Sequence, residues 1–143
     1  MNTILLIEDN VNNVMLLEDI FLLDDISARL VSVETGEEAL QMLPLLDPLV
    51  VLMDLTLPGM CGLDAIRTIK RDPATKGIRV WAITARNTRY DIDDALAAGC
   101  DGYFTKPVTT KQLVEQLRVF ENGETRNLVH QTAGQTHEYN PAD

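Results

Sequence analysis

Five short apolar runs alternate with five amphipathic segments, and this alternation restricts the possible folds more than any other feature of the chain. The runs are typical of β-strands and lie at residues 4–7, 30–33, 49–53, 78–83 and 103–104. The amphipathic segments are typical of helices and lie at residues 11–24, 36–46, 62–71, 87–98 and 109–121. Strict alternation implies right-handed crossovers, so it predicts a doubly wound α/β fold with a five-stranded parallel sheet covered on both faces.

Several expected helices carry boundary signals. Gly99 is placed to end the fourth helix, and Thr109 with Gln112 fits a capping box for the fifth. Pro44 lies inside the second helix and is expected to shorten or bend it. The third apolar run is continuous up to Asp54, which favours a central strand buried on both sides.

Residues 1–121 are predicted to form one domain, followed at 122–143 by a polar extension that is flexible or forms an interface. With 143 residues, of which 45% are hydrophobic, the chain can build a full core. His130 and His137 lie seven positions apart in the extension. They could be metal ligands, but solvated loop histidines are the favoured interpretation.

The charge balance is acidic, with 22 Asp and Glu against 12 Lys and Arg and a net charge of −10. This disfavours nucleic acid as a partner and favours basic protein surfaces or cations. Cys61 and Cys100 have no metal-ligand or redox spacing, so both are expected to be buried, reduced thiols. No apolar run approaches the ~20 residues that span a membrane, and the N-terminus lacks a basic leader, so a cytoplasmic protein is expected.

Charged and hydroxyl side chains follow the predicted strands at the points where the strands end. Glu8 and Asp9 follow the first strand, Asp54 ends the third, Thr84 ends the fourth and Lys106 follows the fifth. Because the carboxyl ends of parallel strands share one edge of the sheet, these side chains are predicted to meet there.

Three carboxylates at one edge imply a cation. Two like charges ~4 Å apart repel by ~4 kcal/mol at an effective dielectric of 20, and one lysine cannot neutralise three acids. An all-oxygen site with room for water suits Mg²⁺. We therefore predict Mg²⁺ held by Asp9 and Asp54, with Glu8 acting through water and the backbone carbonyl of Thr56 completing the set.

With a cation present, Asp54 can act as a carboxylate nucleophile and form an acyl phosphate. A phosphoryl group would find three partners at this edge: the metal, the Lys106 ammonium and the Thr84 hydroxyl. Pro58 and Gly62 are expected to shape the loop after Asp54 and to leave room for metal and phosphate.

These residues resemble a two-component response-regulator receiver domain of the stand-alone, single-domain type. The resemblance covers residues 3–121 and rests on four stretches in the family's order: LLIEDN (5–10), LMDLTLPGMCGLDAI (52–66), VWAITA (80–85) and DGYFTKP (101–107). It implies the flavodoxin-like (βα)5 fold with strand order 2-1-3-4-5. It also implies a phosphoprotein that signals through protein contacts and is phosphorylated by a sensor histidine kinase or a histidine phosphotransfer protein. Such a protein is expected to be no enzyme beyond its own phosphotransfer and dephosphorylation.

The resemblance also implies roles for individual residues. Glu8 and Asp9 match the acidic pair, Asp54 the phosphoacceptor, Thr84 the hydroxyl and Lys106 the lysine.

A conformational switch is implied as well. Thr84 is expected to move toward the phosphate while Tyr103 turns inward, which biases a surface of the fourth helix, fifth strand and fifth helix. The Lys106–Pro107 bond matches a cis peptide of the family. Cys61 departs from an acidic residue common there, and Thr56 and Arg86 occupy positions that tend to set the rate of hydrolysis.

Two other functions compete with a receiver. A small phosphatase of the haloacid-dehalogenase type also uses an aspartate nucleophile and Mg²⁺, but it needs a second Asp where this chain has Thr56. A receiver-like module that binds without phosphorylation is the other alternative, although every chemical residue is present.

The first predicted helix has two apolar rows where a surface helix normally has one. The broader row is the expected core side and consists of Leu16, Leu17, Ile20, Phe21 and Leu23. The second row consists of Val11, Val14, Met15 and Leu22 and is interrupted by Glu18. We predict that Val11, Met15 and Leu22 contact a kinase, a phosphotransfer helix or a second copy in a homodimer; alternatively, the C-terminal extension covers them.

Overall fold

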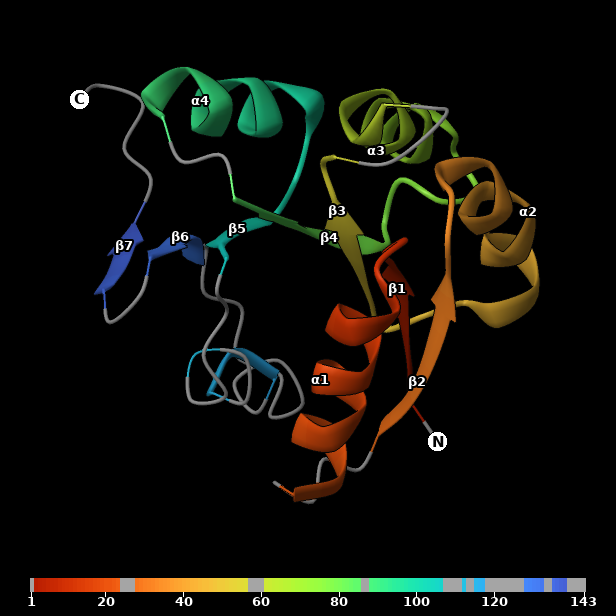
Figure 1. The fold of residues 1–143 in the computed structure, drawn as a ribbon. Coiled ribbons are helices and arrows are strands. Elements are labelled where there is room, and N and C mark those ends of the chain that lie inside the picture. Colours follow the sequence, from red (N-terminus) through yellow and green to blue (C-terminus); the bar gives the residue numbers. More distant parts are fainter. Residues whose placement is uncertain are drawn as a thin grey trace.

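The computed structural model describes residues 2–23, 28–56, 61–85, 88–106, 112, 115–117, 128–132 and 135–138. Its strands are β1 (Asn2–Ile7), β2 (Ala28–Val33), β3 (Val50–Asp54), β4 (Arg79–Thr84), β5 (Gly102–Thr105), β6 (Leu128–Thr132) and β7 (Gln135–Glu138). Its helices are α1 (Val11–Leu23), α2 (Gly36–Leu46), α3 (Gly62–Arg71) and α4 (Arg89–Ala98) (Figure 1). Residues 112 and 115–117 are also helical and fall in the range predicted for a fifth helix.

The strands form one sheet in the order β2-β1-β3-β4-β5-β6-β7. The first five pair in parallel, which confirms the doubly wound α/β fold with order 2-1-3-4-5. The extension adds two strands that the sequence did not predict: β6 pairs in parallel with β5, and β7 pairs antiparallel with β6. In this pairing His130 lies opposite His137.

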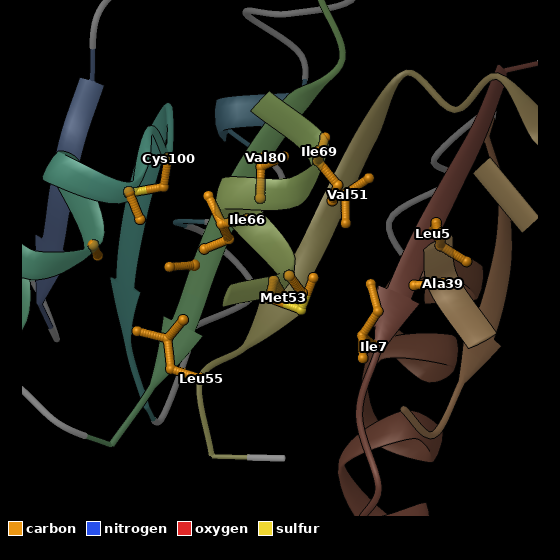
Figure 2. Packing of buried hydrophobic residues seen from close by; sticks show 14 of the residues in the cluster. Leu5, Ile7, Ala39, Val51, Met53, Leu55, Ile66, Ile69, Val80 and Cys100 are labelled. Atoms are coloured by element: carbon orange, nitrogen blue, oxygen red, sulfur yellow. The ribbon is translucent and has the colours of Figure 1, made fainter. Parts of the chain in front are cut away.

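The sheet separates two cores. Figure 1 shows α1 on one face and α2, α3 and α4 on the other. Alternate strand residues serve the two sides: Val51 and Met53 of β3 pack under α3, whereas Val50 and Leu52 belong to the core under α1 (Figure 2). All five residues of β3 are buried, as expected for a central strand.

The helix ends follow local chemistry. The Thr35 side chain accepts a hydrogen bond from the Glu38 backbone N–H at the start of α2. Thr88 and Asp91 form a capping box at the start of α4, which ends as predicted at Gly99 with φ +110°. Pro44 remains inside α2, which continues to Leu46. The predicted capping residue Thr109 and the Lys106–Pro107 peptide lie outside the described residues.

Two sequence-based placements on α1 need correction. Leu17, Ile20 and Phe21 of α1 are buried as predicted, but Leu16 is 54% exposed because it lies at the shoulder of the helix. Val14 packs against the core instead of standing on the outer face. The helix itself spans Val11–Leu23, within one residue of the predicted range 11–24.

The two cysteines differ from each other. Both are free, as predicted, but Cys61 is exposed because it immediately precedes α3, whereas Cys100 is buried. Burial raises the pKa of the Cys100 thiol to about 12, so it is protonated at neutral pH. Among the helices of the described ranges, none has both the length and the apolar character needed to cross a bilayer.

Candidate functional site

The ends of four parallel strands bring the predicted residues to one edge of the sheet. Ile7 at the end of β1 is in register with Met53, so Glu8 and Asp54 follow side by side. Asp54 in turn is in register with Ile83, next to Thr84 at the end of β4. The Lys106 backbone N–H donates to the Thr84 carbonyl at 2.8 Å. This hydrogen bond places Lys106, which follows β5, at the same edge.

Three carboxylates meet at this edge. One carboxylate oxygen from each of Glu8, Asp9 and Asp54 lies within 4.8 Å of the other two. Glu8 and Asp54 are only 4% and 3% exposed, whereas Asp9 is exposed. The cluster therefore combines two buried acids with one that remains open to water.

A single ammonium bridges the two buried acids. Lys106 Nζ lies 2.9 Å from Asp54 Oδ2 and 3.0 Å from Glu8 Oε2. Burial alone would lower the pKa of Lys106, but its bonds to Asp54 and Glu8 outweigh burial and raise that pKa. Lys106 is therefore charged at neutral pH and fixed at the centre of the site.

The second oxygen of Asp54 is held by Thr56. The backbone N–H and the hydroxyl of Thr56 both donate to Asp54 Oδ1 at 2.9 Å. Burial raises the pKa of Asp54, but the hydrogen bonds from the Thr56 N–H and the Lys106 ammonium lower it by more. The net pKa is therefore below the usual 3.8. Asp54 is consequently an ionised carboxylate with a fixed orientation, which is the form that a nucleophile requires.

Glu8 is oriented by the beginning of α1. Its Oε1 accepts from the Asn10 backbone N–H and from Asn13 Nδ2, each at 3.2 Å. Asn10 also caps the helix, because its Oδ1 accepts from the Asn12 N–H at 2.9 Å. Asn13 was not among the residues predicted for the site; its place one turn into a helix that follows an acidic pair is the signal that could have identified it.

Gly62 lets α3 approach the strand end. A Cβ at this position would lie 2.8 Å from the Asp54 carbonyl oxygen and 2.8 Å from Leu55 Cα. The predicted role of Gly62 in shaping the site therefore has a steric basis, since α3 begins directly against the backbone that carries Asp54. Pro58 and Arg86 lie outside the described residues.

The donor set fits a hard divalent cation. The carboxylates of Glu8, Asp9 and Asp54 supply three negative charges against the one positive charge of Lys106. Clustered carboxylate oxygens with an exposed member suit Mg²⁺, which keeps several of its waters. The residues present are therefore suitable for the predicted ion.

Thr84 and Tyr103 are buried residues of the neighbouring strands β4 and β5. Thr84 is fully buried at the end of β4. Tyr103 on β5 is 1% exposed, so its ring lies inside the core that also contains Ala95 and Ala98 of α4. The hydroxyl predicted for phosphate contact and the aromatic ring predicted for switching thus lie on neighbouring strands, with Ala82 and Tyr103 in register.

A cavity of about 290 Å³ adjoins Asp54 on the α1 side. Its apolar wall consists of Leu6, Leu16, Leu17, Ile20 and Ile83. Its polar wall consists of Glu8, Asn13, Asp54 and Lys106. The site is therefore bordered by apolar surface that belongs largely to one face of α1.

Comparison with known proteins now gives the family. The model of the response regulator receiver domain matches residues 4–118. The chain belongs to this family. Receiver domains of this kind serve phosphorylation-controlled signalling in two-component systems, and the phosphatase alternative is not favoured.

Individual relatives agree with this assignment. The polar-differentiation response regulator DivK of Brucella ovis is 28% identical over 118 residues, which cover 82% of this chain and 94% of DivK. DivK of Brucella suis gives the same values. Nearly the whole length of these relatives is therefore represented in the chain.

Solved structures show the same fold. The signal receiver domain of the DNA binding response regulator merR from Colwellia psychrerythraea 34H has a TM-score of 0.79 and 27% identity, covering 85% of this chain and 99% of that one. The receiver domain of the sensor histidine kinase PA1611 from Pseudomonas aeruginosa has a TM-score of 0.75 and 27% identity, covering 85% and 98%. The latter structure has a magnesium ion coordinated in its active site cleft.

Proposed function

We propose that Asp54 is the phosphoacceptor and takes its phosphoryl group from the phosphohistidine of a sensor histidine kinase or a histidine phosphotransfer protein. The observation that carries this proposal is the setting of Asp54: an ionised, 3% exposed carboxylate, fixed by Lys106 and Thr56 at a strand end where Glu8 and Asp9 converge. A carboxylate that stays ionised and is held in one orientation has the form that attack on phosphorus requires.

Transfer requires little covalent chemistry from the protein. A carboxylate oxygen of Asp54 attacks phosphorus and forms the O–P bond as the N–P bond of the donor breaks. The electron pair of that bond returns to the imidazole, which takes a proton from solvent. Lys106, already 2.9 Å from Asp54, can then pair with a phosphoryl oxygen, and Thr84 offers its hydroxyl to another.

Magnesium completes the proposed site. Asp9 and Asp54 would bind it directly, Glu8 through water, and the Thr56 carbonyl would be the fourth protein contact. When bound, the ion neutralises charge on the carboxylates and on the transferred phosphoryl group. Support comes from the carboxylate cluster and from the magnesium ion in the PA1611 receiver domain.

The proposed output is a change of surface. Thr84 would move toward the phosphoryl group, and the position of Tyr103 would follow, so that the surface of α4 and β5 responds to phosphorylation. The receiver unit would span residues 1–121, with residues 122–143 as an extension. Signalling would occur in the cytoplasm through protein contacts, without nucleic acid or membrane, and the only reactions would be phosphotransfer and hydrolysis of its own acyl phosphate.

Labelling with a small phosphodonor tests the proposal. Acetyl phosphate with MgCl₂ is expected to add one base-labile phosphoryl group, measured by intact mass. Omitting Mg²⁺ or introducing Asp54→Asn should abolish the addition. Asp64→Asn, which changes an exposed aspartate of α3, is the matched control and should label like the wild type.

The competing functions give different results. Turnover of many unrelated phosphate esters would indicate a phosphatase. Absence of any labelling would indicate a module that binds without phosphorylation. Either result would exclude Asp54 as the acceptor in a receiver.

A further inference from the structure

Thr105, the last residue of β5, carries a buried hydroxyl group. The residue is 8% exposed, and its Oγ1 makes no hydrogen bond to any residue that the structure describes. Such a hydroxyl loses its bonds to water on folding without replacing them, which is unfavourable. Buried polar groups of this kind are uncommon in folded proteins, so each one calls for an explanation. This one lies a single residue before Lys106.

Thr105 lies directly beside Thr84. The two threonines are register partners in the parallel pair of β4 and β5. The Lys106 backbone N–H donates to the Thr84 carbonyl at 2.8 Å, so the two strand ends are tied together at this point. Because the backbones are held in this way, the distance between the two hydroxyl groups depends on rotation of the side chains about χ1.

The two threonines belong to the same face of the sheet. Successive residues of a strand point to opposite faces, so residues two positions apart share a face. Ala82 of β4 and Tyr103 of β5 belong to the core that includes residues of α4. Thr84 and Thr105 each follow two positions later. They are therefore neighbours on the side of the sheet that carries α4 (Figure 1).

The hydrogen-bonding needs of the two hydroxyl groups are complementary. A threonine hydroxyl can donate one hydrogen bond while its oxygen accepts another. In the proposed reaction Thr84 donates to a phosphoryl oxygen, which leaves the lone pairs of its own oxygen available. Thr105 has a proton without an acceptor in the described part of the chain. A bond from Thr105 to Thr84 would satisfy that proton and would polarise the Thr84 hydroxyl, which strengthens its bond to phosphate.

We propose that Thr105 is a positioning residue for phosphorylation, whose hydroxyl donates to Thr84 Oγ1 when Thr84 donates to the phosphoryl group on Asp54. The proposal rests on the proposed function, in which Asp54 is the acceptor and Thr84 contacts the phosphoryl group. Each hydroxyl keeps its own hydrogen, so no proton is transferred between them. The unfavourable burial of the Thr105 hydroxyl is present before phosphorylation and relieved after it, which favours the phosphorylated state.

Removing the hydroxyl with little change of shape tests the proposal. Thr105→Val replaces the hydroxyl by a methyl group, whereas Thr105→Ser keeps the hydroxyl. The rate of labelling by acetyl phosphate with MgCl₂, followed by intact mass, should fall roughly fivefold in Thr105→Val. This factor corresponds to the loss of one net hydrogen bond. Thr105→Ser should label at close to the wild-type rate.

A double-mutant cycle tests whether Thr105 acts through Thr84. Thr84→Val should itself slow labelling, and adding Thr105→Val to it should slow labelling no further. If Thr105→Val slows labelling equally with and without the Thr84 hydroxyl, Thr105 acts by another route and the proposal is wrong. It is also wrong if Thr84→Val labels at the wild-type rate, since Thr105 would then have no contact to support.

Thr75 provides the matched control for loss of a buried hydroxyl. It is 7% exposed, but its hydroxyl donates to the Ile69 carbonyl oxygen at 2.7 Å. Without Mg²⁺ or phosphodonor, Thr75→Val should lower Tm by about 3 °C, whereas Thr105→Val should not lower it. Thr75→Val should label at the wild-type rate. An equal loss of Tm in the two variants would mean that the Thr105 hydroxyl is already bonded before phosphorylation, which would overturn the proposal.

The outcomes separate this inference from the proposed function. If the wild type is not labelled by acetyl phosphate, the proposed function is wrong, and the role of Thr105 falls with it. If the wild type is labelled and Thr105→Val keeps the wild-type rate, Asp54 remains the acceptor and only the role of Thr105 is wrong.

Discussion

Lys106 Nζ lies 2.9 Å from Asp54 Oδ2, and the same ammonium lies 3.0 Å from Glu8 Oε2. A side chain that follows β5 thus ties together the ends of β1 and β3, across 98 and 52 positions of sequence. Both acids are almost fully buried, so the ammonium is the charge that makes their proximity tolerable without a metal. The contact has both a structural and a chemical consequence.

Removing this ammonium should destabilise the metal-free protein. Lys106→Met leaves two buried carboxylates without their cation, and we expect a loss of about 2–3 kcal/mol. Urea unfolding followed by the fluorescence of Trp81, the single and buried tryptophan, measures the change. Lys76→Met removes an exposed lysine and should cost little. Equal losses in the two variants would mean that the bridge contributes no stability.

Magnesium should stabilise the folded protein through the carboxylates. A ligand at ten times its Kd adds about 1.4 kcal/mol, which is roughly 4 °C in Tm for a chain of this size. Thermal unfolding with and without MgCl₂ measures the shift. Asp9→Asn and Asp54→Asn should abolish it, whereas Asp94→Asn, an exposed aspartate of α4, should retain it. A shift that survives Asp9→Asn would place the ion elsewhere.

The sequence predicted the site because the site depends on topology. Asp54 and Thr84 end apolar strands, and parallel pairing brings such ends together whatever the details of packing. The five-strand order and the buried β3 follow from the same alternation. The distances from Lys106 Nζ to Glu8 and Asp54 show that these three side chains lie together at that edge.

Features that depend on side-chain rotation or weak pairing were missed. Thr56 was predicted to contribute its carbonyl, and the structure shows in addition that its N–H and hydroxyl hold Asp54. Leu16 was assigned to the core because a helical wheel does not fix how far α1 is rolled on the sheet. β6 and β7 consist largely of polar residues without clear alternation, so nothing local predicted that β6 pairs with β5 and β7 with β6.

The stability of the site should depend on pH at both ends of the scale. The pKa of Asp54 is lowered below 3.8. The contribution of ionised Asp54 to the free energy of unfolding is therefore complete above pH 3.8 and is lost as pH falls through the folded-state pKa. The pKa of Lys106 is raised above 10.5. The contribution of protonated Lys106 to the free energy of unfolding is therefore complete below pH 10.5 and is lost as pH rises through the folded-state pKa. Urea unfolding in EDTA from about pH 2 to 6 should show wild type gaining stability over Asp54→Asn as pH rises. A difference independent of pH would contradict this.

A second ion pair should matter for stability but not for phosphorylation. Lys70 Nζ lies 2.8 Å from Asp101 Oδ2 and 2.7 Å from the Ile78 carbonyl oxygen, and Asp101 also accepts from the Val80 N–H. These contacts lie at the opposite end of β4 from Thr84. Asp101→Ala should therefore lower the free energy of unfolding by about 2 kcal/mol. Acetyl phosphate labelling of the folded protein should be unchanged; a slower rate would mean that the two edges are coupled.

Gly62 offers the sharpest test of how the fold positions Asp54. Gly62→Ala places a Cβ 2.8 Å from the Asp54 carbonyl oxygen and from Leu55 Cα, both backbone atoms, so α3 or the strand end must shift. We expect a cost of about 1–3 kcal/mol in urea unfolding and slower labelling by acetyl phosphate, because the carboxylate moves relative to Lys106. Gly77→Ala is the matched control, since a Cβ there meets no atom within 4 Å. If both variants label at the wild-type rate, close packing of α3 does not position the phosphoacceptor.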